Sequence, residues 1–320
     1  MHMHAISNKK SKIPHSNRPW IRAMQSGNFA RAWEVSDAHL RARLAAGSPP
    51  HAGPRHLQQI WDGGPLTDKR VLVRCYHGLG DTIQFIRFAA PLRKMAREVV
   101  VWGQPPLLPL LASASGVDRV LPLHDGTPDV DFDCDLEIME LAHALRIDEP
   151  SIRCAVPYVF VDEQWTPLRK RRRDLAVGLV WRAGDWDERR SVPVNFLSAL
   201  SHVSGVRLFS LQCGPAKAEA SRIPAEVVAT SDVGRTAVTL RHLDLLISVD
   251  TFVAHLAGAL GVRVWLLLHA DCDWRWMQER SDTPWYPTMR LFRQRSAGDW
   301  PTVIEELMAA LQQLRQRNGY

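Results

Sequence analysis

Hydrophobic residues gather in short runs that alternate with helical spacings from residue 69 onward. The runs at 71–75, 98–102 and 120–123 are short and apolar, which predicts buried strands. Between them, 81–95 and 105–116 repeat their apolar residues at the spacing of helices. Strands that alternate with helices in this way predict parallel pairing with helical crossovers.

The same pattern begins again after residue 174. Strands are predicted at 175–181, 206–212, 227–230, 243–249 and 262–268. Helices are predicted at 193–202, 236–242, 251–260 and, at the end of the chain, 301–317. Two successive units of similar size predict an α/β protein in which two Rossmann-like domains face a cleft. The pattern leaves the order of the strands open.

The N-terminal part differs from both units. Residues 20–46 show the apolar spacing of helices, and 27–33 resembles part of a tetratricopeptide repeat. Because such repeats need several neighbours to bury their faces, a single copy predicts a small helical appendage that packs on the rest of the chain. Residues 1–18 are polar and basic without an apolar core, so we expect a disordered tail and not a secretory signal.

These patterns divide the chain into an appendage, two domains and a last helix. We place the appendage at 19–65, the first domain at 66–165, the second at 174–298 and the last helix at 299–320. The basic run Arg169–Arg173 lies between the domains. We interpret it as a solvated linker, with a lipid or phosphate contact as the alternative.

Composition narrows the class of protein. Of 320 residues, 46% are apolar and 23% charged, as is typical of soluble globular proteins, and no apolar run is long enough to predict a transmembrane helix. Five scattered cysteines favour a reducing, cytoplasmic setting. The net charge of +6 favours anionic partners such as a nucleotide sugar or, peripherally, an anionic membrane. We expect no nucleic-acid partner, because the basic residues are otherwise dispersed.

A glycine-rich loop follows the first predicted strand. Gly78-Leu79-Gly80-Asp81 stands where that strand meets a helix. Gly78 and Gly80 allow a sharp turn and the close approach of another molecule. Asp81 points to the crevice at the strand ends, where α/β sheets bind ligands, and is a candidate base. The alternative is that Asp81 only caps the helix.

The strongest local signal lies at 247–261, where a buried strand runs directly into a helix. Asp250 and Thr251 stand at the junction, and the free N–H groups of the first helical turn form a ready phosphate site. His255 shares a helix face with Thr251 and could donate to a diphosphate. Alternatively, Asp250 or Thr251 is an N-cap, His255 is a satisfied interior histidine and Gly261 is a C-cap.

Three further groups of residues could carry chemistry. Arg182, Arg189 and Arg190 follow a strand and could offset diphosphate charge, or could pair with acidic residues on a surface loop. Trp274 and Trp285 could stack on a base or a sugar ring, or could pack a long loop as we expect of Trp276.

The acidic residues of Asp129–Glu137 would share one strand face. Metal ligation is conceivable there, but we expect a solvated edge strand and assign no metal. Zinc-ligand spacing, a Walker A loop and a nucleophile elbow are missing from the sequence.

Together these stretches resemble glycosyltransferase family 9, the heptosyltransferase-like group, and most closely its bacterial subset with tetratricopeptide repeats. The resemblance covers roughly residues 61–311. It is carried by His77–Phe85, Val249–Thr251, Ala254–Gly261, Asp273–Trp276, Trp285–Pro287 and Met289–Gln294.

The resemblance implies a GT-B fold, with the acceptor on the first domain and the nucleotide sugar on the second. The C-terminal helix is then expected to pack back toward the first domain. The implied reaction inverts the anomeric centre and needs neither metal nor cofactor, and ADP-heptose is the commonest donor of this family. Asp81 matches the family's base, and Asp250, Thr251 and His255 match the segment that holds the diphosphate.

Some positions depart from the family's pattern. Phe252 replaces a small residue beside the diphosphate, and the loop after Trp181 lacks an alignable lysine. With Phe252, the expected donor site also includes Arg182, Arg189 and Trp274.

Two other classes of function fit parts of the sequence. A catalytically silent nucleotide-sugar binder or partner subunit would explain Phe252, although Asp81 and Asp250-Thr251 count against it. A nicotinamide-dependent dehydrogenase needs a Gly-x-Gly-x-x-Gly turn, and Ile83 occupies the third glycine position. We therefore expect transfer of a heptose-like sugar from a nucleoside-diphosphate sugar to a hydroxyl of a glycan, a lipid-linked molecule or a protein.

Overall fold

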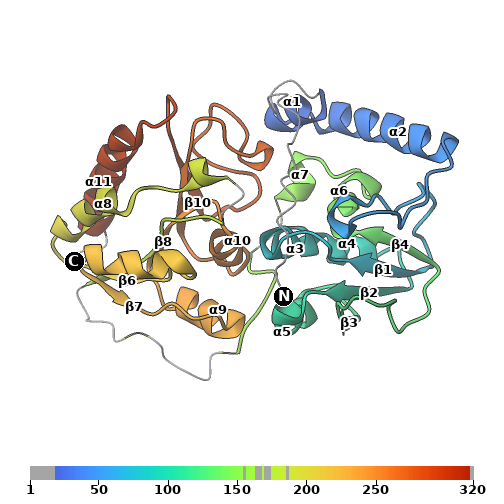
Figure 1. The fold of residues 1–320 in the computed structure, drawn as a ribbon, viewed down its shortest axis with the longest axis horizontal. Coiled ribbons are helices and arrows are strands. Elements are labelled where there is room, and N and C mark those ends of the chain that lie inside the picture. The colour runs from blue at the N-terminus through green and yellow to red at the C-terminus, as the bar shows by residue number, and fades with distance from the viewer. Residues whose placement is uncertain (1–18, 154–155, 163–167, 169–173, 185–186, 318–320) are drawn as a thin grey trace, which may run out of the picture.

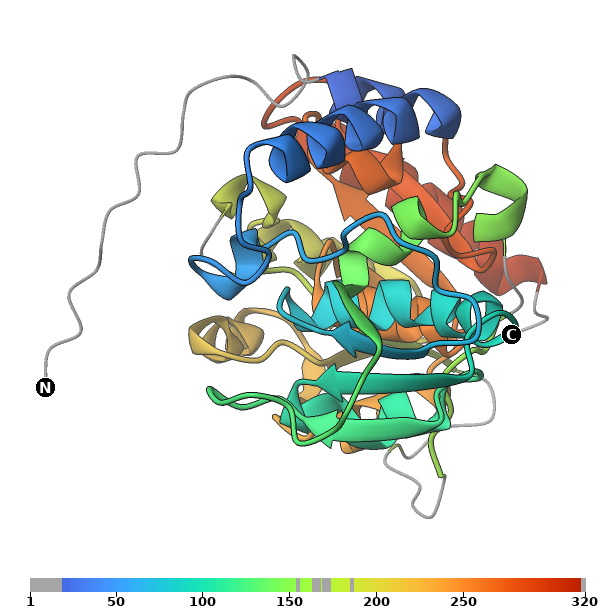
Figure 2. The same ribbon diagram turned by 90° about the vertical axis from the view of Figure 1, so that its right-hand side faces the viewer.

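The structure, a computed structural model, describes residues 19–153, 156–162, 168, 174–184 and 187–317. The expected tail at 1–18 and the basic run Arg169–Arg173 lie outside these residues. Figure 1 shows two α/β units, and in Figures 1 and 2 the helices of the N-terminal appendage lie together along the top of the view. The predicted α/β class with two Rossmann-like domains is confirmed.

The appendage is a pair of helices, α1 (Pro19–Gln25) and α2 (Phe29–Ala45). Gly27 adopts a φ of 72°, which favours glycine, and breaks the helical stretch between them. Asn28 then caps α2, because its side chain accepts from the Arg31 N–H. Burial of apolar side chains from both helices fixes the pair to the first domain.

The first domain contains a four-stranded parallel sheet in the order β3-β2-β1-β4. Its strands are β1 (Arg70–Arg74), β2 (Glu98–Gly103), β3 (Arg119–Pro122) and β4 (Cys134–Glu137). The acidic stretch therefore ends in an edge strand, as predicted. It is not fully solvated, because Glu137 is buried.

The second domain contains a six-stranded parallel sheet in the order β10-β9-β8-β5-β6-β7. Its strands are β5 (Leu175–Val180), β6 (Val206–Ser210), β7 (Ala225–Val227), β8 (Leu245–Val249), β9 (Val264–Leu268) and β10 (Met289–Arg293). Read from β7, this is the Rossmann order 3-2-1-4-5-6. The strands stay parallel, but the order in which the chain adds them reverses between β5 and β8. Ligands bind such sheets beyond the carboxyl ends of the strands at that switch point.

Helices cover the two sheets and extend from the strand ends. In the first domain and its linkers they are η2 (Arg55–Leu57), α3 (Leu79–Phe85), η3 (Ile86–Phe88), α4 (Ala89–Arg93), η4 (Pro105–Leu107), α5 (Leu108–Ser113), η5 (Ile138–Glu140), α6 (Leu141–Ala144) and α7 (Glu149–Ile152). In the second they are η6 (Glu188–Arg190), α8 (Val194–Leu197), η7 (Ser198–His202), η8 (Pro215–Arg222), α9 (Val233–Arg241), α10 (Phe252–Ala259), η9 (Trp274–Trp276) and α11 (Trp300–Arg317). No helix within the described ranges has the length and apolar character to cross a membrane.

The two domains meet along helices α3 and α10, which lie side by side near the middle of Figure 1. One apolar core runs through this contact and joins residues of both domains to the appendage. Gly80 makes the close approach possible, because a Cβ at this position would lie 2.9 Å from the His255 ring and 3.5 Å from the Phe252 Cα. The glycine-rich loop therefore touches the second domain directly.

The last helix corrects one expectation. We expected α11 to pack back toward the first domain, but its buried side chains join the core of the second domain. They include Val303, Ile304 and Leu307, and Arg315 donates to Ser204 Oγ at 3.0 Å. The apolar stripe of α11 therefore packs in the second domain, whose last strand, β10, comes before this helix in the sequence.

Candidate functional site

The loop after β1 forms one side of the candidate site. Asp81 lies in the first turn of α3, where its Oδ2 accepts from the Gly78 N–H at 3.0 Å. Its Oδ1 accepts from the Arg275 guanidinium of the second domain. Asp81 therefore caps the start of α3, as the alternative proposed. The same carboxylate also faces the cleft between the domains, and 27% of its side chain is exposed.

Arg275 fixes Asp81 from the opposite domain and was missed in the sequence. It is buried, donates to Gln84 Oε1 at 2.7 Å and to Asp273 Oδ1 at 2.9 Å, and lies over the Trp274 ring. Burial alone would lower the pKa of Arg275, but the carboxylates of Asp273 and Asp81 raise it above its ordinary value. Its permanent charge holds Asp81 in place.

A histidine beside Asp81 was also missed. His77 Nδ1 lies 2.9 Å from Oε1 of Glu137, which is at the end of β4. The same Oε1 accepts from the Tyr76 N–H at 3.1 Å. Burial alone would lower the pKa of His77, but the contact with Glu137 and the charges of Glu137 and Asp81 raise it. Glu137 reaches His77 because β4 pairs with β1 in the sheet, and the sequence pattern leaves this strand order open.

Asp250 forms the other side of the site, at the end of β8. The guanidinium of Arg190 donates to the Asp250 carbonyl at 3.0 Å and lies 3.9 Å from its Oδ2, while His255 Nε2 lies 3.5 Å from Oδ1. Burial alone would raise the pKa of Asp250, but His255, Trp276 and Arg190 lower it to about 2. Asp250 is therefore an anion that anchors the start of α10.

This pairing predicts a pH-dependent contribution to stability. A pKa lowered from 3.8 to about 2 corresponds to about 2 kcal/mol that is present above pH 3.8 and lost as the pH falls toward 2. We expect Asp250→Asn to lower the free energy of unfolding by at least about 2 kcal/mol at pH 6, with the deficit shrinking toward pH 2. Denaturant unfolding across this range measures it.

Asp271→Asn is the matched control, because Asp271 is exposed and its partner Arg189 is also exposed. The assignment of Asp250 would be wrong if both variants lost the same small amount at every pH.

His255 lines the cleft, but both of its ring nitrogens have partners inside the protein. Nδ1 lies 2.9 Å from the Tyr286 hydroxyl, Nε2 faces Asp250, and the ring stacks on Trp276. The interior alternative is therefore the one that the structure supports. His255 has no ring nitrogen left for a diphosphate, and it positions Asp250 instead.

Thr251 is at the N-cap position of α10, yet its side chain makes no capping hydrogen bond. Its hydroxyl lies 3.3 Å from Ser248 Oγ. The N–H groups of Phe252 and Val253 belong to the first turn of α10, where no intrahelical partner exists. All three residues line the cleft, so the positive end of the α10 dipole faces this cavity.

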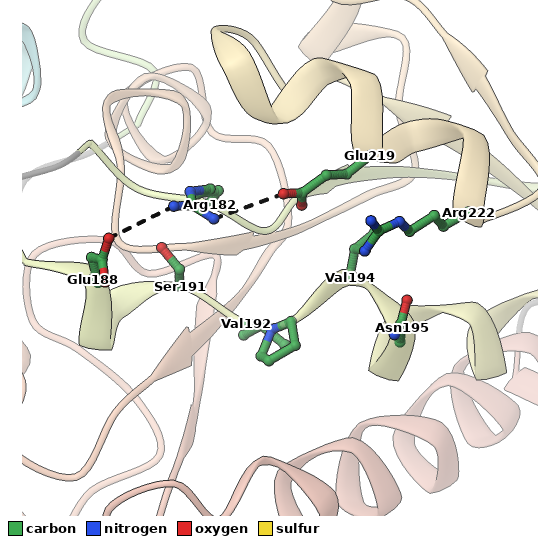
Figure 3. A pocket seen from close by; sticks show the side chains of 9 residues that line it. Arg182, Glu188, Ser191, Val192, Val194, Asn195, Glu219 and Arg222 are labelled. Carbon is green, nitrogen blue, oxygen red and sulfur yellow. Dashed lines mark ion pairs between the residues drawn. The ribbon is translucent and has the colours of Figure 1, made fainter.

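The arginines after β5 divide into two groups. Arg182 lies between Glu188 and Glu219, at 3.8 and 3.7 Å, and lines both the cleft and a smaller pocket of about 310 Å³ (Figure 3). Arg190 also lines the cleft. Arg189 is instead paired with Asp187, at 2.9 Å, and is not among the residues that line the cleft.

Trp274, which we expected at the donor site, does not line the cleft either. Its ring meets that of Trp20 from the appendage at 5.0 Å and that of Trp285 at 6.0 Å, so the long loop packs against α1. Trp285 and Trp276 are fully buried, as packing residues are. The tryptophan cluster therefore holds Arg275 in position and fastens the appendage.

The cleft itself is a cavity of about 1100 Å³ that both domains line. Asp81, Gly78 and Gly80 line it from the first domain, and Asp250, Thr251, Phe252 and Arg190 from the second. The two stretches that the sequence singled out, 170 positions apart, thus meet across one gap. Within the described ranges, no group of three or more His, Cys, Asp and Glu side chains could hold a metal ion.

We compared the sequence and the fold with those of known proteins. No family model matches the chain. Protein FlbA of Caulobacter vibrioides is 26% identical over 344 aligned positions, which cover 89% of this chain and 52% of FlbA. The chain therefore spans about half the length of that curated relative.

Solved structures are similar in fold at low identity. The glycosyl transferase family 9 structure from Veillonella parvula has a TM-score of 0.58 at 12% identity, covering 79% of this chain and 98% of that one. E. coli ADP-heptose lps heptosyltransferase II has a TM-score of 0.53 at 13% identity, covering 76% and 99%. The iron-containing dodecameric glycosyltransferase TibC from enterotoxigenic E. coli has a TM-score of 0.53 at 12% identity, covering 80% and 78%.

These structures share a two-domain architecture with this chain. The chain has the GT-B fold seen in structures of glycosyltransferase family 9. The family resemblance that the sequence carries is thereby confirmed at the level of the fold.

Proposed function

We propose that this protein is an inverting, metal-independent glycosyltransferase that moves a heptose-like sugar from a nucleoside-diphosphate sugar to an acceptor hydroxyl. The observation that carries the proposal is the meeting of Asp81 and the α10 N-terminus across one cavity. A carboxylate on one side and a cluster of amide donors on the other are what a displacement at an anomeric carbon requires. The three similar solved structures, all named as glycosyl or heptosyl transferases, support this proposal.

The donor diphosphate is proposed to bind at the start of α10. The N–H groups of Phe252 and Val253 and the Thr251 hydroxyl donate to its oxygens, and Arg190 and Arg182 supply positive charge. These groups stabilise the negative charge that develops as the bond from the anomeric carbon to the diphosphate breaks. Because protein cations and the helix dipole meet this charge, we infer that no metal ion is needed.

The acceptor is proposed to approach from the Asp81 side. Its oxygen attacks the anomeric carbon from the face opposite the diphosphate, and its proton passes to the Asp81 carboxylate. Arg275 and the Gly78 N–H hold that carboxylate in a fixed orientation. A positioned base of this kind contributes about 10²–10⁴-fold to the rate.

A silent nucleotide-sugar binder is the second candidate function. It is favoured by Phe252, a large residue that lines the cleft where the family's pattern has a small one. Such a protein would bind a donor without ever releasing its nucleoside diphosphate.

One experiment tests the proposed function and separates the two candidates. The purified chain is screened by thermal shift against ADP-, UDP-, GDP- and TDP-sugars, and nucleoside diphosphate release is then measured with the best donor. At 100 times its Kd the true donor should stabilise the fold by about 2.7 kcal/mol. We expect ADP-heptose to be that donor, slow release in the absence of acceptor, and the same rate with EDTA present.

Each result against the proposal has a distinct meaning. Binding without any release would establish the silent binder. Loss of release in EDTA, restored by a divalent cation, would overturn metal independence. No stabilisation by any of the four classes of donor would sink the proposed function as a whole.

A further inference from the structure

A second large cavity lies beneath the N-terminal helices. It measures about 880 Å³ and has three walls: α1 and α2 above, the first domain below, and the loop around η9 at the side. We call it the appendage cavity. Figures 1 and 2 show the helices that roof it at the end of the molecule nearest α6 and α7.

The appendage cavity adjoins the cleft. Three residues, His56, His77 and Asp273, line both spaces. His77 precedes Asp81 by four positions and both line the cleft, so a molecule in the appendage cavity could extend a hydroxyl past His77 to Asp81. The donor side of the cleft lies at the far end of this path, at the start of α10.

The walls of the appendage cavity are mostly apolar. Trp20, Trp33 and Trp61 line it, and each indole N–H is already donated within the protein: to Ser36 Oγ, to the Ile147 carbonyl and to the Gly64 carbonyl. These rings therefore offer carbon faces and no hydrogen-bond donor. The aliphatic lining is made by Ile21, Met24, Val35, Leu40, Leu57 and Met139.

The two cavities differ in their cationic side chains. Among the described residues that line the appendage cavity there is no lysine or arginine, although the chain has a net charge of +6. The carboxylates Glu137, Glu140 and Asp273 line it instead. The cleft also has carboxylates in its lining, but it adds three guanidinium groups, those of Arg182, Arg190 and Arg275. A phosphate group would thus find guanidinium partners in the cleft, whereas in the appendage cavity it would meet carboxylates without any lysine or arginine.

From this contrast we propose that the appendage cavity is the acceptor site and that it takes a phosphate-free, uncharged acceptor held by an aromatic or aliphatic group. The proposal rests on the proposed function and narrows its acceptor. The apolar part packs on the tryptophan and aliphatic side chains, and the hydroxyl reaches the cleft beside His77. Glu137 lies 2.9 Å from Nδ1 of that histidine and holds the ring at the boundary between the two cavities.

The test uses two probes that share one aromatic group. 4-Nitrophenyl β-D-glucoside is neutral, whereas 4-nitrophenyl phosphate is anionic. Binding of each to the full chain is measured by calorimetry for the wild type and for Val35→Trp, which fills the cavity from α2. His39→Trp, at an exposed lining position, is the second blocking variant, and Ala38→Trp, exposed on the same helix outside the lining, is the control.

We expect the glucoside to bind the wild type and Ala38→Trp alike, and both blocking variants at least ten-fold more weakly. The phosphate should show no binding that the blocking variants remove. ADP affinity, measured on the same samples, should be unchanged in all of them. Absence of glucoside binding, glucoside binding that neither blocking variant weakens, or equally tight phosphate binding there would overturn the acceptor site. Failure of ADP to bind the wild type would count against the proposed function instead.

Discussion

Asp81→Ala should lose nearly all sugar transfer and keep its affinity for the nucleotide. Removing the carboxylate takes away the proton acceptor, which costs about 10²–10⁴-fold in rate. It also removes one partner of Arg275, whose remaining hydrogen bonds to Asp273 and Gln84 keep that side chain in place. The nucleotide contacts of α10 lie across the cleft, so the Kd for ADP should stay within about three-fold by calorimetry. Nucleoside diphosphate release from the donor measures the rate.

A matched variant separates catalysis from helix capping. Asp148 also accepts an N–H at a helix start, from Ser151 at 2.9 Å, but it caps α7 and does not line the cleft. Both Asp148→Ala and Asp81→Ala should lower stability, because each removes a side chain that accepts an N–H at the start of a helix. Only Asp81→Ala should stop turnover. A turnover near the wild-type rate would leave Asp81 as a cap alone.

Much of the fold follows from the pattern of apolar runs, because strands buried on both faces read as short apolar segments. β5, β8 and β9 lie within a few residues of their predicted bounds. β10 was missed because Arg290 and Arg293 interrupt its run, although pairing with β9 buries its other residues. β7 begins two residues before the predicted strand, since its side chains are largely exposed and carry little apolar signal.

The candidate site was predictable only in part, for a related reason. Asp81 and Asp250 follow predicted strands directly, so their place at the carboxyl ends of two sheets could be foreseen. Glu137 and Arg275 could not, because their positions depend on strand order and on a loop from the other domain. The one local signal was that an aspartate and an arginine, Asp273 and Arg275, stand two positions apart, a spacing that allows the ion pair seen between them.

Single residues with two physical meanings were the least predictable. His255 has the spacing of a phosphate ligand and equally that of an interior histidine, and only the positions of Tyr286 and Asp250 decide between them. Trp274 could stack on a ligand, yet Trp20, more than 250 positions away, takes its ring face-to-edge. Trp20 is far from Trp274 in the sequence, and the spacing of residues within one segment cannot predict which distant side chains it will contact.

The start of α10 can be tested through a single N–H group. Phe252 is the first residue of the helix, and Thr251 before it is extended, with φ −144° and ψ 168°. Proline is compatible with both features, because it fits the first helical position and requires an extended residue before it. Phe252→Pro therefore removes the N–H while leaving the helix intact. Phe252→Ala removes the same ring and keeps the N–H, which makes it the matched control.

The most direct measurement is the Kd of ADP for these two variants, by calorimetry at equal salt. A hydrogen bond to a charged oxygen contributes about 1.5–3 kcal/mol, so ADP should bind Phe252→Pro at least about ten-fold more weakly than Phe252→Ala. Both variants should melt at the same temperature. Equal affinity of the two variants for ADP would contradict a diphosphate held by the amide groups of α10, and with it the account of this cleft.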